Sequence, residues 1–182
     1  QSQKNHYYKK LDDLLGGDFY VDINQFGERD FPTNPDAGQN DLNNPNRIVT
    51  VGDKLGYNYD LNIKKGSVWM QGVFKFRKMD FFVATEHSYT SFFRYGNVKT
   101  GLFKDDSYGK STTYNFYNSG IKAGLTYKID GRNYVFANGS YGSRAPYFEN
   151  AFIAPRTRDF VQENLKSEEN LSTEVGYVLN AP

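Results

Sequence analysis

The sequence has no cysteine and little histidine. Its 182 residues include two histidines, His6 and His87, and a single tryptophan. Without cysteine, disulfides, thiolate metal sites and cysteine nucleophiles are excluded. Two histidines leave little material for a Ser-His-Asp triad or a multi-histidine metal site. We expect His87 to be a packed or lumen-facing polar side chain in a strand, and we expect no enzymatic activity, no metal and no cofactor.

An excess of charge of one sign is also missing, as are long apolar runs. The 22 basic and 21 acidic side chains give a formal net charge of +1, which offers no field to recruit nucleic acid or an anionic membrane surface. No run of about 18 apolar residues is present, which excludes a transmembrane helix but not a transmembrane strand. The first five residues lack signal-peptide features, so we expect a processed chain or an internal segment.

Aromatic residues and glycine are abundant. Tyr and Phe each occur 15 times, Gly occurs 17 times and Pro six times, a composition typical of strands separated by turns. Apolar and polar residues alternate over 57–63 and again in the later segments. The expected strands are 57–77, 81–94, 114–129, 133–143 and 171–180.

The first third of the chain has a different pattern. Residues 3–15 carry Tyr7, Tyr8 and three leucines at loosely helical spacing, followed by two glycines, which predicts a short helix. Residues 24–46 are rich in Asn, Asp, Gly and Pro and predict a long irregular loop. We therefore divide the chain into a loop region with a possible helix, 1–56, and a strand region, 57–182.

The connections between the strands differ at the two ends. Tight turns are expected at 78–80 and 130–132, and long loops at 95–113 and 144–170. Transmembrane β-barrels have short turns on the periplasmic side and long loops outside. The fold class we predict is all-β: an antiparallel meander forming part of a large transmembrane β-barrel, with long loops at one end.

Side-chain parity changes near 64–66. Tyr57, Tyr59 and Leu61 occupy odd positions, whereas the apolar residues from Val68 onward occupy even positions. A β-bulge at 64–66 inside one long strand explains the change and keeps the long loops together. Six aromatic residues near the tight turns fit an aromatic girdle at a membrane interface, and ordinary cross-strand pairs are the alternative. They are Phe74, Phe76, Phe81, Phe82, Tyr127 and Tyr134.

Several short runs resemble the barrels of TonB-dependent outer-membrane receptors, in particular the peptidase-regulatory-like group. The order of these runs along the chain carries the resemblance. They are Gly52-Asp53-Lys54-Leu55-Gly56-Tyr57, Trp69-Met70-Gln71, Ser88-Tyr89-Thr90-Ser91-Phe92-Phe93-Arg94, Lys122-Ala123-Gly124-Leu125-Thr126-Tyr127, Arg144-Ala145-Pro146 and Glu174-Val175-Gly176-Tyr177.

The resemblance implies an outer-membrane location and an active importer of a nutrient such as a glycan, peptide, siderophore or cobalamin. It also implies a barrel of about 22 strands, a plug domain in the parent chain, and TonB as partner. Five strands cannot close such a barrel, so we expect the segment to supply wall and ligand-facing loops. In isolation it is expected to self-associate.

Candidate substrate-binding residues lie at the end of the sheet that carries the long loops, where aromatic rings can stack on a ligand and arginines can bind a carboxylate or phosphate. Packing of loop against loop is the alternative. The competing function is a soluble β-sandwich that binds carbohydrate or protein. The candidates are Arg94, Tyr95, Tyr108, Tyr147, Phe148, Arg156 and Arg158.

Overall fold

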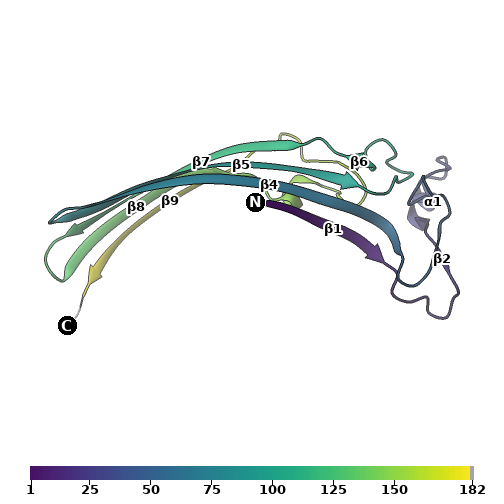
Figure 1. The fold of residues 1–182 in the computed structure, drawn as a ribbon, viewed down its shortest axis with the longest axis horizontal. Coiled ribbons are helices and arrows are strands. Elements are labelled where there is room, and N and C mark those ends of the chain that lie inside the picture. The colour runs from purple at the N-terminus through teal and green to yellow at the C-terminus, as the bar shows by residue number, and fades with distance from the viewer. Residues whose placement is uncertain (181–182) are drawn as a thin grey trace. The chain divides into compact units, whose positions relative to one another are not determined.

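The structure is a computed structural model that describes residues 1–180. Strands hold 54% of the chain and helices 6%, and the strand pairs are antiparallel, which confirms the all-β class. The elements are named here in chain order, and Figure 1 labels most of them. They are β1 (Ser2–Lys10), β2 (Tyr20–Val21), α1 (Gln25–Asp30), β3 (Ile48–Val49), β4 (Lys54–Lys75), β5 (Met79–Gly96), β6 (Gly109–Lys110), β7 (Tyr114–Lys128), β8 (Asn133–Arg144), α2 (Phe148–Ala151) and β9 (Glu168–Leu179).

The main sheet is a meander. Its strand order is β1-β4-β5-β7-β8-β9, with β6 added beside β5, while β2 and β3 form a separate two-stranded sheet. The connections β4–β5 and β7–β8 are short, and those after β1, β5 and β8 are long, as the sequence predicts. The second short turn is held by Asp130, whose carboxylate accepts hydrogen bonds from the backbone N–H groups of Arg132 and Asn133, each at 2.8 Å.

The helix predicted at 3–15 is wrong, because residues 2–10 form strand β1. This strand pairs with β4, with Ser2 opposite Lys64 and Tyr8 opposite Asn58. The Tyr7 ring stacks on Tyr59 with centroids 5.1 Å apart. Pairing with a strand distant in sequence outweighs the weak helical spacing of the apolar residues. The main sheet therefore begins well before the predicted boundary at residue 56.

The segment 24–46 is more ordered than an irregular loop. Asp22 is buried and accepts hydrogen bonds from Asn40 Nδ2 and the Gly56 backbone N–H, both at 2.8 Å, and forms an ion pair with Arg47 at 2.9 Å. Asn24 caps α1 by accepting a hydrogen bond from the Gly27 N–H. Among residues 1–180, no helix is long and apolar enough to cross a membrane.

Strand β4 is continuous through 64–66, as predicted. The register irregularity that the β1–β4 pairing contains lies further along, where Tyr8 pairs with Asn58 and Lys9 with Leu55. Gly56 sits in this irregularity with a φ of +68°, a value that suits glycine. The bulge at 64–66 stays a prediction.

The chain forms two compact units, and β4, β5 and β7 contribute residues to both. The loop unit comprises Gln1–Lys64, Ser91–Tyr114 and Tyr147–Leu165, and the hairpin unit comprises Lys65–Thr90, Asn115–Pro146 and Lys166–Pro182. Most buried apolar side chains belong to the loop unit, including Leu61 and Phe92, which are 1% and 2% exposed. The loop unit therefore has a hydrophobic core of its own.

Gly96 lies at a tight contact in the loop unit, where an added Cβ would clash with the Ser107 carbonyl oxygen. We expect Gly96→Ala to lower the free energy of unfolding by about 1–3 kcal/mol, the usual cost of overpacking. Gly139→Ala is the matched control, because a Cβ at that position meets open space. Urea titration followed by circular dichroism measures both. Equal urea midpoints for the two variants would contradict the close contact between Gly96 and the Ser107 carbonyl oxygen.

Candidate functional site

Arg94 is the most buried of the predicted site residues and serves as the centre of the loop unit. Its side chain is 1% exposed. The guanidinium donates hydrogen bonds to Asp159 Oδ1 at 2.6 Å, to the Pro155 carbonyl at 2.6 Å and to the Ser107 carbonyl at 2.9 Å. Its Cζ atom lies 5.2 Å from the centroid of the Tyr59 ring. Arg94 thus holds two long loops together, and a ligand has no access to it.

Electrostatics around Arg94 follow from burial. Burial raises the pKa of Asp159, and the positive charge of Arg94 opposes this rise. Burial also raises the pKa of Tyr59. Removing one partner of such a pair leaves an uncompensated buried charge. The Arg94–Asp159 ion pair therefore stabilises the packing of the loops.

Phe148 is also buried and not available to a ligand. It packs in an aromatic cluster of the loop unit, with its ring 4.7 Å from Phe152 and 6.4 Å from Phe92. Helix α2 positions Phe148 and Phe152 for these contacts. Arg94 and Phe148 therefore pack loop against loop, which is the alternative that the sequence analysis left open. The prediction that these two residues contact a substrate is wrong, because both side chains are buried.

The other candidates lie closer to the surface. Tyr95, Tyr108 and Tyr147 are 40%, 51% and 57% exposed. Arg158 lies between two rings, 4.5 Å from the centroid of Phe103 and 4.4 Å from that of Phe160. Arg156 is exposed, and its guanidinium lies 5.1 Å from the centroid of the Tyr57 ring. Of the seven candidates, Arg156 alone lines the cavity described next.

A cavity of about 580 Å³ opens within the loop unit, and we call it the loop pocket. It collects residues from β1, from the segment around α1, from the start of β4 and from the loops after β5 and β8. Its aromatic residues are Tyr20, Phe26, Tyr57 and Phe103, and its cations are Lys9 and Arg156. The register irregularity at Gly56 brings Lys9 beside this wall, since a Cβ at Gly56 would lie 4.0 Å from Lys9 Cδ.

Sequence reasoning missed most of the loop pocket. The predicted helix at 3–15 includes Lys9, and the predicted strand at 57–77 includes Tyr57 as one residue of its alternating pattern. The available signal was Gly56, since an isolated glycine in a strand pattern marks a bulge or a close approach. In the part of the chain that the structure describes, no three His, Asp or Glu side chains gather as metal ligands would.

The hairpin unit presents an apolar face whose side chains are largely exposed. Across β7, β8 and β9, residues opposite one another share a face, and odd-numbered residues align in all three strands: Leu125 faces Ala137, which faces Val175. This register shows which residues of β8 lie on the apolar face, a point that the sequence leaves ambiguous because aromatic residues occur at both odd and even positions of this strand. The apolar members on these strands are Ile121, Leu125, Tyr127, Val135, Ala137, Tyr141, Leu171, Val175, Tyr177 and Leu179.

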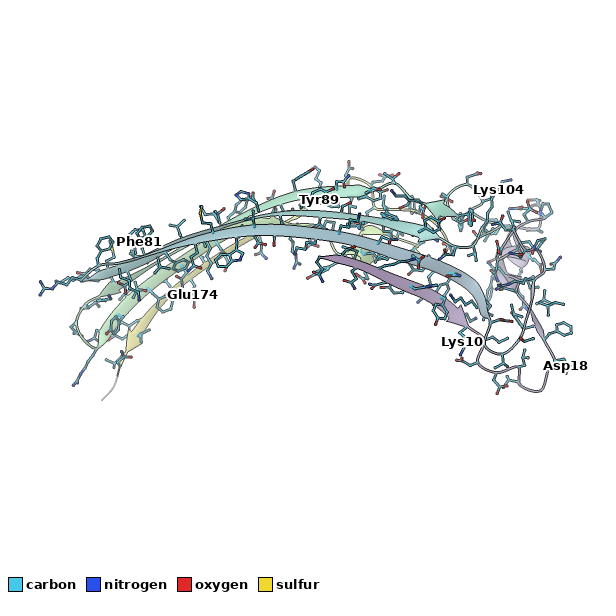
Figure 2. All side chains as sticks on the ribbon, viewed as in Figure 1. Lys10, Asp18, Phe81, Tyr89, Lys104 and Glu174 are labelled. Carbon is cyan, nitrogen blue, oxygen red and sulfur yellow. The ribbon has the colours of Figure 1, made fainter. Side chains whose placement is uncertain are left out.

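Strands β4 and β5 extend the same face. Phe74 stacks on Phe81 with centroids 4.7 Å apart, and Tyr89 meets Tyr117 at 4.9 Å. Many of these side chains are largely exposed, with Val175 at 77% and Met70 at 70%. Figure 2 labels Phe81 and Tyr89, which belong to this apolar face, and Glu174, which belongs to the opposite one. The apolar members on these strands are Val68, Met70, Phe74, Phe76, Phe81, Val83 and Tyr89.

The opposite face of the hairpin unit carries the charged side chains, together with aromatic ones such as Phe82 and Phe136. Lys128 pairs with Asp80 at 2.7 Å, and Arg144 pairs with Glu168 at 2.7 Å. A hollow of about 760 Å³ on this face is lined by residues such as Trp69, Lys122 and Glu168. His87 does not lie among them: it is exposed and lines a shallow groove with Val68 and Tyr89 of the apolar face.

Comparison of the chain with family models, with curated proteins and with solved structures gives no match.

The buried Arg94 allows a direct test of its structural role. We expect Arg94→Ala to lower the free energy of unfolding by about 3–5 kcal/mol, because Asp159 is left without its cation. Arg156→Ala is the matched control: it removes an exposed arginine with no ion pair in the described chain and costs about 1 kcal/mol or less. Thermal unfolding of both variants measures the two losses of stability. Equal losses in the two variants would show that Arg94 does not hold the loops.

Proposed function

We propose that this chain is a segment of an outer-membrane TonB-dependent receptor that imports a nutrient. In this proposal the hairpin unit is part of the wall of a transmembrane β-barrel. Its apolar face contacts lipid, and its polar face lines the lumen. The loop unit lies outside the membrane and contacts the cargo. TonB and a plug domain of the parent chain are the partners that the sequence resemblance implies.

One observation carries the proposal: a single sheet keeps its charged pairs on one face and exposes an apolar other face over the length that a bilayer requires. A transmembrane strand needs about 9–11 residues. The apolar face covers about nine residues in each of 68–76, 81–89 and 171–179, which agrees with that length. A soluble monomer rarely exposes an apolar patch larger than a few hundred Å².

The ends of the apolar face add support. Phe76, Phe81 and Tyr127 lie beside the short turns, and Tyr89 and Tyr117 lie toward the long loops, with much aliphatic surface between them. Lipid-facing barrel surfaces have aromatic girdles at both interfaces. The soluble β-sandwich requires a second sheet over the apolar face. Within residues 1–180 the only other sheet is the two-stranded β2–β3 pair in the loop unit.

Quenching of tryptophan fluorescence by brominated lipid tests the proposed orientation. In a Trp69→Phe background, Val175→Trp places an indole on the apolar face, and Glu174→Trp places one at the same depth on the polar face. We expect brominated phosphatidylcholine vesicles to quench the indole at position 175 strongly and the one at position 174 weakly, because bromine on the acyl chains reaches only the lipid-facing side.

Circular dichroism of both variants in vesicles checks that the strands form. Equal quenching at the two positions, or quenching at neither, would refute the lipid-facing assignment. A chain that stays monomeric and folded in buffer without lipid would favour the soluble sandwich instead.

A further inference from the structure

We infer that the loop pocket binds an acidic carbohydrate, through a sugar unit that carries a carboxylate. The inference rests on the proposed function, because it names the cargo class that the loop unit would contact. The volume of about 580 Å³ falls within the range of about 300–1,000 Å³ that is usual for small-molecule sites. A pocket of this size holds a short oligosaccharide segment rather than a single ion.

The charge of the loop pocket points to an anion. Lys9 and Arg156 both line it, and none of its lining residues, all within residues 1–180, is Asp or Glu. Within the described chain neither Lys9 nor Arg156 forms an ion pair with Asp or Glu, and the Arg156 guanidinium lies over the Tyr57 ring, 5.1 Å from its centroid. A ligand carboxylate would gain charge-assisted hydrogen bonds here without displacing a protein partner.

The rings of the loop pocket suit a flat, partly apolar ligand. Tyr57 is fixed from both sides, since its ring lies 6.2 Å from that of Tyr59 and beneath the Arg156 guanidinium. Phe103 is held in turn by Arg158, 4.5 Å from its centroid. Rings that are already positioned bind a ligand with a smaller loss of conformational entropy. The C–H face of a sugar ring is a surface that such aromatic side chains cover.

Amide side chains in the loop pocket favour a hydroxyl-rich ligand over a plain hydrophobic acid. Asn24 uses its oxygen to cap α1, which leaves its amide N–H groups as donors. Asn40 donates to Asp22, which leaves its amide oxygen as an acceptor. Donor and acceptor together match a sugar hydroxyl, which does both. A site built from such groups rejects ligands that leave them unpaired.

Isothermal titration of the chain in detergent micelles tests the inference with three probes. Trigalacturonate carries three carboxylates on sugar rings, its methyl ester is the same sugar without the charge, and triglutamate is a peptide whose side chains carry the same charge. We expect trigalacturonate to bind at least about tenfold more tightly than either control, as one to two charge-assisted contacts require. Equal binding of trigalacturonate and its ester, or no binding of trigalacturonate at millimolar concentration, overturns the inference. Triglutamate binding as tightly overturns the carbohydrate class.

Variants link the binding to the loop pocket. Arg156→Ala and Lys9→Ala should each weaken trigalacturonate binding by about tenfold or more, whereas Arg156→Lys should retain part of the affinity. Arg132→Ala removes an exposed arginine from the hairpin unit and should change nothing. Loss of binding in Arg132→Ala, or unchanged binding in both pocket variants, would refute the location. The lipid-quenching experiment involves no pocket residue, so it reports on the proposed membrane role independently of this result.

Discussion

The hairpin unit depends on one constraint: a sheet with a single layer has to separate its apolar and polar side chains by strand periodicity alone. Within the described residues the only other sheet is the β2–β3 pair in the loop unit, so every strand must place its apolar side chains on the same face as its neighbours do. The registers of β7, β8 and β9 meet this requirement, with Leu125, Ala137 and Val175 in one row. A shift of one residue in any strand would move its polar side chains onto the apolar face. The two short turns fix the registers of β4 with β5 and of β7 with β8.

The loop unit is stabilised in a different way from the hairpin unit. Its segments are long and polar, and its core is small, so burial of apolar surface alone contributes little to its order. It adds two buried ionic centres instead. Asp22 joins the segments before and after α1 to the start of β4, and Arg94 joins the loops after β5 and β8. Asp22 accepts a hydrogen bond from a backbone N–H and Arg94 donates to two backbone carbonyls, and each also pairs with an opposite charge, which offsets the cost of desolvation.

The sequence predicted the strands and turns of the hairpin unit well because period two is a local signal. It failed at β1, where Tyr7 and three leucines have helical spacing and only the partner strand, with Tyr59, decides the outcome. It failed again at Arg94, because loop composition does not reveal which arginine is buried. The Arg94 partner Asp159 is 65 residues away in the sequence. The loop pocket likewise draws on segments between positions 9 and 157, which no short motif connects.

The separation between Arg94 and Asp159 also bears on how the molecule becomes ordered. Contacts between neighbours in a hairpin require closure of only a few residues, whereas the Arg94 centre requires closure of the whole chain between two distant loops. Hairpins form in about 1–10 μs, and the long-range contacts follow. The Arg94–Asp159 contact encloses β7 and β8 in its loop, so we expect it to form after these two strands have paired, and the Arg94 guanidinium to stay hydrated until then.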